Sequence, residues 1–356
     1  MVSMIVSWVH TPKVLTEVGV DRAVRELVEL KVERALPIIV EGSGALYDTK
    51  VYEKSERSLG DAKIAEFFMK LHEAGIEVHP WIVSLNRPHG KFSQEHRDWY
   101  VVNKKGESCI DKPPYIEHYK WLCPTREETR KFLADNALEI LEKFDVDGIH
   151  LDYIRLPDIR LPIHFRKRYG LPEEDKLFPE YDFCYCEVCR SKYREETGLD
   201  PIEIDYLNKR DYEKWFKWRA KQVSKVVEIA YNAIKKYDPK LKLSAAVFPT
   251  PLIAYRYVFQ QWASWKIDFL CPMIYHKYYE KPVEWIGKAT LECVATGKEI
   301  YSGIHAYMLE EKKEVEKAIQ YALENGADGV CFFLYPFPHK NQLEYFKEAV
   351  KKYYCQ

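Results

Sequence analysis

The sequence lacks an excess of charge of either sign. Its 54 lysine and arginine residues are balanced by 55 aspartate and glutamate residues, so the formal net charge is −1. A protein that binds nucleic acid usually carries a basic excess or a basic cluster. Neither is present, and we therefore expect no nucleic-acid partner.

Long apolar runs are missing as well. No uninterrupted run approaches the roughly 20 residues that a membrane-spanning helix needs, so we expect no membrane association. The apolar N-terminus, MVSMIVSWVHTP (1–12), has no basic region and no small-residue cleavage site. This favours a first β-strand over a signal peptide and predicts a cytoplasmic protein.

Asparagine and glutamine are scarce, whereas lysine and glutamate are abundant. This composition is reported for proteins of hyperthermophiles, and it predicts a thermophilic source. Aromatic residues make up 14% of the chain, with 26 tyrosines and nine tryptophans. Clefts that bind sugars use aromatic faces, although large side chains that fill a core explain the same composition.

Short β-rich runs alternate with amphipathic helical patterns along the chain. The predicted strands cover residues 4–9, 35–41, 76–84, 147–154, 242–248, 268–276, 299–307 and 328–335, and the clearest helical patterns cover 21–33, 61–75, 126–144, 210–237, 313–326 and 342–354. The alternation predicts an α/β fold of the (β/α)8 type, a TIM barrel. A doubly wound dinucleotide fold is disfavoured, because Thr11 and Pro12 follow the first strand where a Gly-rich phosphate loop would stand.

No low-complexity linker and no short repeat interrupts this pattern, which predicts one domain over residues 1–356. Two insertions, roughly 86–122 and 156–209, follow the third and fourth predicted strands. Long loops inside a compact domain are often functional. In a barrel both would lie at the C-terminal ends of the strands, where active sites are found.

The fourth predicted strand, DGIHLDYI (147–154), carries a carboxylate near its end. Alternation places Asp152 on the same face as His150. A barrel strand is buried on both faces, where an unpaired carboxylate costs several kcal/mol. The cost is lower at the last inward position, at the barrel mouth, with a partner such as Arg155. Asp152 is therefore either a structural ion-pair partner or a catalytic carboxylate.

The segment DVDGIHLDYIRLP (145–157) closely resembles the strand-four signature of the glycosyl hydrolase-like 10 family. LCPTREETRKFL (122–133), LSAAVFP (243–249) and QQWASWKIDFLCPMIYH (260–276) look like further segments of that family. The resemblance implies a (β/α)8 glycoside hydrolase-like enzyme that cleaves a glycosidic bond of an oligo- or polysaccharide. In related glycosidases the carboxylate at the end of strand four is the nucleophile of a retaining mechanism, and this role carries over to Asp152.

A retaining glycosidase needs a second carboxyl group as acid and base. Glu41 ends the second predicted strand, Asp158 follows the fourth, and Glu280 lies a few residues past the sixth. Each is a candidate, and each also fits an ordinary ion pair or a solvated loop charge. The alternative proton donors are His276, His305 and Tyr275.

The cleft is expected to be lined by side chains near the C-terminal ends of strands: Trp8, Trp81, Tyr153, Arg155, Tyr275, His305 and Tyr335. Trp8 and Trp81 fit the core equally well. Because no second carboxyl is obvious, a non-catalytic saccharide-binding barrel is the alternative function. A carbohydrate lyase or deacetylase is less favoured, because we find no H-x-x-x-H or similar catalytic metal set.

Three cysteines, Cys184, Cys186 and Cys189, form a C-x-C-x-x-C set in the second insertion. A tetrahedral zinc ion needs a fourth ligand, for which Cys123 is the best candidate because adjacent loops meet at the barrel mouth. Cys109, His118 and His164 are its rivals. The arrangement is similar to the structural zinc site of family 42 β-galactosidases, and it implies a structural zinc ion. The alternative is a set of reduced thiols.

Overall fold

The computed structural model describes residues 4–172, 176–339 and 341–354. Its strands are β1 (Met4–Val9), β2 (Val32–Glu41), β3 (Gly44–Ala45), β4 (Glu77–Val78), β5 (Trp81–Val83), β6 (Gly148–Asp152), β7 (Lys242–Val247), β8 (Phe269–Pro272), β9 (Tyr301–His305) and β10 (Gly329–Tyr335). Its α-helices are α1 (Thr11–Lys13), α2 (Val20–Glu29), α3 (Asp61–Glu73), α4 (Gly90–Glu95), α5 (Glu127–Lys143), α6 (Ile163–Arg168), α7 (Glu187–Thr197), α8 (Lys209–Tyr237), α9 (Pro251–Val258), α10 (Trp285–Val294), α11 (Lys312–Glu324) and α12 (Gln342–Tyr354).

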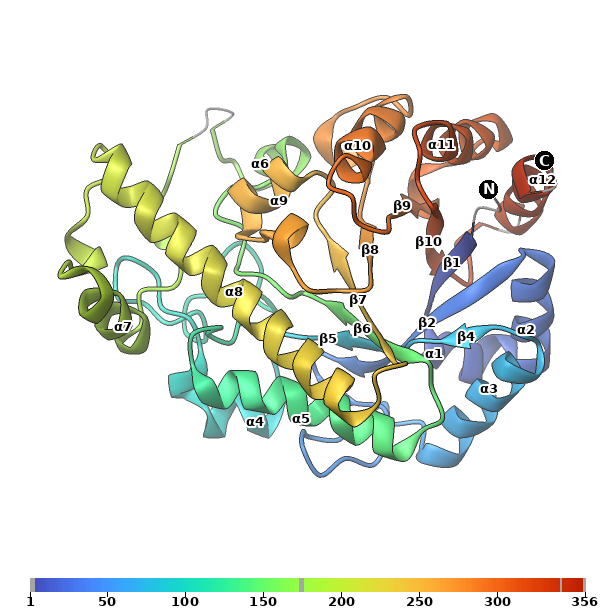
Figure 1. The fold of residues 1–356 in the computed structure, drawn as a ribbon, viewed down its shortest axis with the longest axis horizontal. Coiled ribbons are helices and arrows are strands. Elements are labelled where there is room, and N and C mark those ends of the chain that lie inside the picture. The colour runs from blue at the N-terminus through green and yellow to red at the C-terminus, as the bar shows by residue number, and fades with distance from the viewer. Residues whose placement is uncertain (1–3, 173–175, 340, 355–356) are drawn as a thin grey trace.

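Apart from β3, which pairs antiparallel with β2, the strands form a parallel barrel enclosed by helices (Figure 1). Neighbouring strands follow the order β8-β7-β6-β5-β2-β1-β10-β9. Parallel bridges from Leu270 to Ile300 and from Met273 to Gly303 join β8 to β9 and close the ring. The third predicted strand is split into β4 and β5, which both pair with β2. The predicted (β/α)8 barrel is thus confirmed.

Side chains alternate between the inside of the barrel and the helical layer. Trp8, Trp81 and Cys271 are among the residues of an inner apolar cluster, whereas Ile149 and Leu151 of β6 belong to the outer core beneath the helices. The other face of β6 is polar and points inward: His150 is fully buried and accepts a hydrogen bond from the Trp8 indole at 2.9 Å. The predicted alternation of β6 is therefore observed.

The predicted helix boundaries agree with the structure to within a few residues, except in the first helix. The pattern predicted a helix over 21–33, but α2 ends at Glu29 and β2 begins at Val32. Lys31 between them has a φ of 58°. A left-handed residue ends a helix, so the chain enters the strand although the apolar spacing continues.

The two long connections lie after β5 and β6 and carry their own short helices, α4 in the first and α6 and α7 in the second. The second is fixed to α8 by a buried charge pair between Asp182 and Arg219. Asp182 also accepts hydrogen bonds from Tyr185 at 2.7 Å and from Tyr206 and Tyr212 at 3.2 Å. None of the helices in the described part of the chain has the length and apolarity that a bilayer span requires.

We expect Asp182→Ala to lower the free energy of unfolding by about 3–5 kcal/mol, because Arg219 keeps its charge in a buried site without its carboxylate. Urea unfolding at pH 7 measures the change. The matched control is Asp135→Ala, which breaks an exposed ion pair with Lys131 and should cost less than about 1 kcal/mol. Equal losses in the two variants would contradict this account.

Candidate active site

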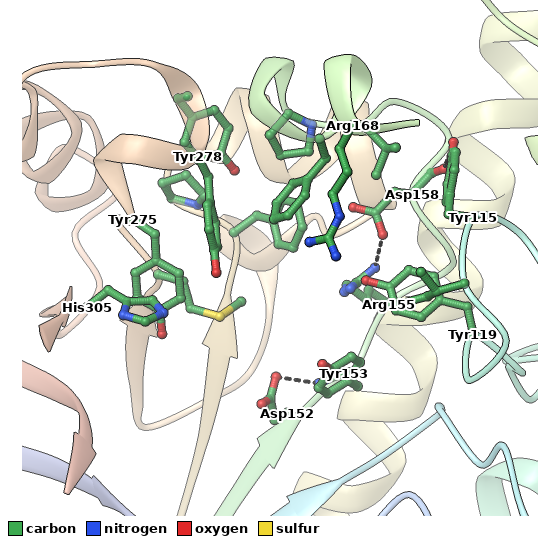
Figure 2. Close-up of a pocket in the computed structure, with 18 of the residues that line it drawn as sticks. Tyr115, Tyr119, Asp152, Tyr153, Arg155, Asp158, Arg168, Tyr275, Tyr278 and His305 are labelled. Atoms are coloured by element: carbon green, nitrogen blue, oxygen red, sulfur yellow. Dashed lines mark hydrogen bonds and ion pairs between the residues drawn. The ribbon is translucent and has the colours of Figure 1, made fainter. Parts of the chain in front are cut away.

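A cavity of about 480 Å³ opens at the C-terminal ends of the strands (Figure 2). Its wall is built from β5 and β10, from the ends of β6 and β9, from the residues just after β7 and β8, and from both long connections. Seven residues that the sequence predicted for the site line it: Trp81, Asp152, Tyr153, Arg155, Asp158, Tyr275 and His305. The strand ends and the two connections therefore converge on one site.

Asp152 is the last residue of β6 and lies at the base of this cavity (Figure 2). It is only 7% exposed, and its Oδ1 accepts a hydrogen bond from the backbone N–H of Tyr153 at 2.6 Å. Tyr153 has a φ of 53°, a left-handed conformation that is uncommon for a bulky residue. The strand thus ends directly after the carboxylate, and the chain turns away from the barrel.

Burial raises the pKa of Asp152 to about 6. The Tyr153 backbone N–H, the charge of Arg155 and the Trp81 indole all lower it, but they do not offset the loss of water. The carboxylate is therefore mostly ionised at neutral pH and becomes protonated in mildly acidic solution. A carboxyl group with a raised pKa in a cavity is typical of a functional site.

Two polar atoms near Asp152 are buried without a hydrogen-bond partner in the described structure: the Tyr275 hydroxyl and His305 Nδ1. Both residues line the cavity, and their rings pack edge to face with centroids 4.6 Å apart. Burial lowers the pKa of His305 to about 4, so its imidazole is neutral at pH 7. Buried polar groups normally have partners, so these two are available to the hydroxyl groups of a ligand.

The sequence suggested Arg155 as a partner of Asp152. In the structure, Arg155 pairs with Asp158 instead. Its Nη1 lies 2.8 Å from Asp158 Oδ2, and both side chains are less than a tenth exposed. Aromatic rings flank the guanidinium, with Trp121 at 4.5 Å and Phe248 at 5.0 Å from Cζ. Burial raises the pKa of Asp158 although Arg155 opposes the change. Asp158 is thus no solvated loop charge, because it forms part of the cavity wall.

Several lining residues were not predicted from the sequence. The first long connection contributes Tyr115, His118 and Tyr119; the second contributes Phe165, Arg168 and Tyr169; and the turn after β8 contributes Tyr278 and Tyr279. For most of them, the only indication in the sequence was that they lie in the two insertions expected at the barrel mouth. Which loop side chains face the cavity depends on contacts distant in sequence, such as the hydrogen bond from the Tyr115 hydroxyl to the Asp158 carbonyl.

The two glutamates predicted as acid/base candidates do not line the cavity. Glu280 follows the turn after β8 and forms an exposed ion pair with Lys167 at 2.8 Å. Glu41 ends β2, lies 3.4 Å from Arg57, and has a pKa raised by burial. Each glutamate thus occupies an ion pair outside the cavity wall.

Trp8 and Tyr335 do not line the cavity either. Trp8 points inward, but it lies deeper in the barrel, where it binds His150. Tyr335 ends β10 and donates a hydrogen bond from its hydroxyl to Glu26 of α2 at 2.6 Å. Pairing between β1 and β10 is irregular after Ser7. Such an irregularity changes which face a strand residue occupies, and Tyr335 turns toward the helices.

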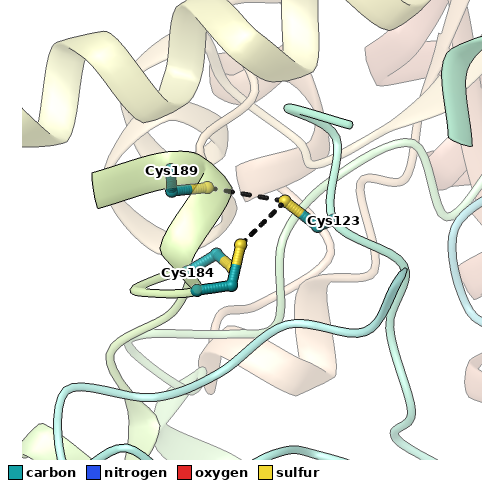
Figure 3. A group of neighbouring side chains, drawn as sticks. Cys123, Cys184 and Cys189 are labelled. Atoms are coloured by element: carbon teal, nitrogen blue, oxygen red, sulfur yellow. Dashed lines mark hydrogen bonds between the residues drawn. The ribbon is translucent and has the colours of Figure 1, made fainter. Parts of the chain in front are cut away.

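The four predicted cysteines come together in one buried cluster (Figure 3). Their sulfur atoms all lie within 4.8 Å of one another. Cys123 Sγ is 3.4 Å from Cys189 Sγ and 3.6 Å from Cys186 Sγ. Zn–S bonds of about 2.3 Å in a tetrahedron place sulfur atoms about 3.8 Å apart. The cluster therefore has the ligands and the spacing to hold a metal ion, with Cys123 as the fourth ligand.

Two families match the chain in separate segments. Residues 19–153 match the family described as Hypothetical glycosyl hydrolase 6, and residues 169–321 match Glycosyl hydrolase-like 10. The resemblance to the latter family is confirmed. The strand-four signature, however, falls at the end of the segment that matches the former. No curated protein sequence matches the chain.

Solved structures with a similar fold include glycoside hydrolases. The glycoside hydrolase domain of PgaB (BpsB) from Bordetella bronchiseptica superimposes with a TM-score of 0.71 at 11% identity, over 99% of this chain and 98% of that one. Alpha-L-fucosidase isoenzyme 2 from Paenibacillus thiaminolyticus has a TM-score of 0.66 at 15% identity, with 99% and 49% covered. A beta-galactosidase from Bacillus circulans sp. alkalophilus has a TM-score of 0.61 at 11% identity, with 99% and 56% covered. The chain spans about half of the latter two, and at these identities the likeness shows the fold.

If the cysteine cluster holds zinc, the purified protein should contain about one zinc ion per chain. Cys186→Ser should lower both the metal content and the melting temperature, because the two loops lose their cross-link. Elemental analysis and calorimetry measure the two effects. Cys293→Ser, which changes a buried cysteine outside the cluster, is the control for metal content. A metal-free wild type would exclude the assignment.

Asp152→Asn should stabilise the fold at pH 7. Folding raises the pKa of this carboxyl from 3.8 to about 6, so the ionised group destabilises the native state, by roughly 2–3 kcal/mol above pH 6. The penalty fades as the pH falls from 6 toward 4, and the two proteins should then become equally stable. Urea unfolding at pH 7 and pH 4.5 measures this. A less stable variant at pH 7 would instead indicate a structural ion pair.

Proposed function

We propose that the protein is a glycoside hydrolase that cleaves an oligo- or polysaccharide with Asp152 as the nucleophile. The observation that carries this proposal is a buried carboxylate at the end of β6, at the base of a cavity, with unpartnered polar atoms beside it. The match of both halves of the chain to glycosyl hydrolase-like families supports the reaction class.

The composition of the cavity wall favours a saccharide. Tyrosine rings from both long connections and from the turn after β8 provide flat apolar faces, on which a sugar ring can stack. The unpartnered atoms of Tyr275 and His305 can exchange hydrogen bonds with hydroxyl groups. Apolar faces combined with a few fixed polar atoms are what an amphipathic sugar ring requires.

In the proposed reaction, an Asp152 oxygen attacks the anomeric carbon as the bond to the leaving oxygen breaks. The resulting glycosyl ester is then cleaved by water, which restores the carboxylate. Asp158 is the other carboxyl group among the described lining residues, and we assign the acid and base role to it. Burial favours its protonated form, which can give a proton to the leaving oxygen.

One observation favours a non-catalytic saccharide-binding barrel as the second candidate function. The only described carboxyl groups that line the cavity are Asp152 and Asp158, and Asp158 is held by Arg155. An ion pair favours the ionised form of a carboxyl group, and the ionised form has no proton to give to the leaving oxygen. If Asp158 never releases Arg155, the cavity binds sugars without cleaving them.

Replacing Asp152 by Asn should lower hydrolysis by at least about 10³-fold and leave saccharide affinity within a few fold, since the other contacts to the sugar remain. Wild-type kcat/KM should fall about tenfold per pH unit below pH 6, as Asp152 becomes protonated. A glycan panel assayed for cleavage and binding, at ambient and elevated temperature, measures both effects. Asp135→Asn, a surface carboxylate, is the control.

The same panel distinguishes the two functions. A wild type that cleaves no glycan, together with weaker binding by Asp152→Ala, would support the binding barrel. Equal binding by wild type and variant with no cleavage by either would contradict both functions.

A further inference from the structure

Arg168 is the last residue of α6, in the long connection after β6. Its side chain lines the cavity, and Figure 2 shows the guanidinium directed inward, between Tyr278 and Arg155. Within the described residues, this guanidinium makes no hydrogen bond and no ion pair. A cation thus points into the cavity without a protein group to bind.

The neighbours of Arg168 on the same helix have different roles. Arg166 donates a hydrogen bond from Nε to the Leu161 carbonyl at 2.8 Å, and Lys167 pairs with Glu280 at 2.8 Å on the surface. Neither lines the cavity. These contacts fix α6 beside the cavity. Arg168 makes no comparable contact within the described residues.

The charged groups that line the cavity leave one anion and one cation without a direct ion-pair partner. In the pair that the structure shows, Arg155 and Asp158 neutralise each other. Among the described lining residues, Asp152 then remains as a negative charge at the base, and Arg168 as a positive charge drawn above it in Figure 2. The cavity is therefore polarised, with a carboxylate at the proposed reaction centre and a free guanidinium away from it.

We propose that the saccharide bound here carries an anionic substituent, a carboxylate or a sulfate ester, that Arg168 recognises; this inference rests on the proposed function. Guanidinium groups bind carboxylate and sulfate oxygens through two parallel hydrogen bonds, and the charge strengthens them. The substituent lies away from the bond that is cleaved, because beside Asp152 it would face a like charge. The tyrosines between the two sites then contact the sugar ring itself.

The test measures binding to oligosaccharides in matched pairs: uronic-acid oligomers with their carboxyl-reduced forms, and sulfated oligomers with their desulfated forms. Asp152→Asn protein is used so that no ligand is consumed. At least one anionic oligomer should bind about tenfold more tightly than its neutral partner. Arg168→Gln should reduce this preference to within about twofold. Lys167→Gln removes the same charge from the same helix outside the cavity, and should leave the preference unchanged.

Each outcome decides between the two proposals. A preference for a uronic acid that Arg168→Gln abolishes identifies a carboxylate, and the same result with a sulfated oligomer identifies a sulfate ester. Equal binding of charged and neutral partners, or a preference that Arg168→Gln leaves intact, overturns the inference but not the proposed function. A protein that binds no saccharide of either kind overturns both.

Discussion

The site depends on one constraint: apolar side chains fill the inside of the barrel, so an unpaired ionised side chain costs least where a strand ends. Asp152 occupies that position on β6. Even there it is buried, and its pKa rises to about 6 because no cation pairs with it directly. Arg155, whose charge acts on Asp152, is paired with Asp158. The reactivity that we assign to Asp152 thus results from a carboxylate that is buried but has no direct ion-pair partner.

The wall around this charge is made of long connections, and these are fixed by contacts behind the cavity. The cysteine cluster joins the chain before α5 to the chain before α7. Tyr181 lies just before the cluster and stacks on Tyr115 of the cavity wall, with ring centroids 4.3 Å apart. The Asp182–Arg219 pair fixes the same segment to α8. The cysteine cluster, the ion pair and the aromatic stack therefore act together to hold these irregular segments in one position.

The sequence predicted the barrel because buried strands and amphipathic helices have clear local patterns. It also predicted Asp152, which is conspicuous within an apolar strand, and Cys123, which completes a set of four thiols. Prediction from the sequence failed for side chains whose position depends on their depth in the barrel or on contacts with residues distant in the chain. Period-two alternation indicates that Trp8 points inward, but not how far it lies below the mouth. An irregularity in the β1–β10 pairing turns Tyr335 outward, and local sequence does not mark it. The loop tyrosines face the cavity only because the assembled connections place them there.

The hydrogen bonds of His150 determine which side chain beside Asp152 can exchange a proton with it. His150 Nε2 accepts from the Trp8 indole, so the ring proton is on Nδ1, which lies 2.9 Å from Ser244 Oγ. Burial lowers the pKa of His150 well below its usual value, so the ring stays neutral. Both ring nitrogens are thus occupied and the ring resists protonation. Although His150 shares the inward face of β6 with Asp152, it is a structural spacer and not a proton donor to that carboxyl.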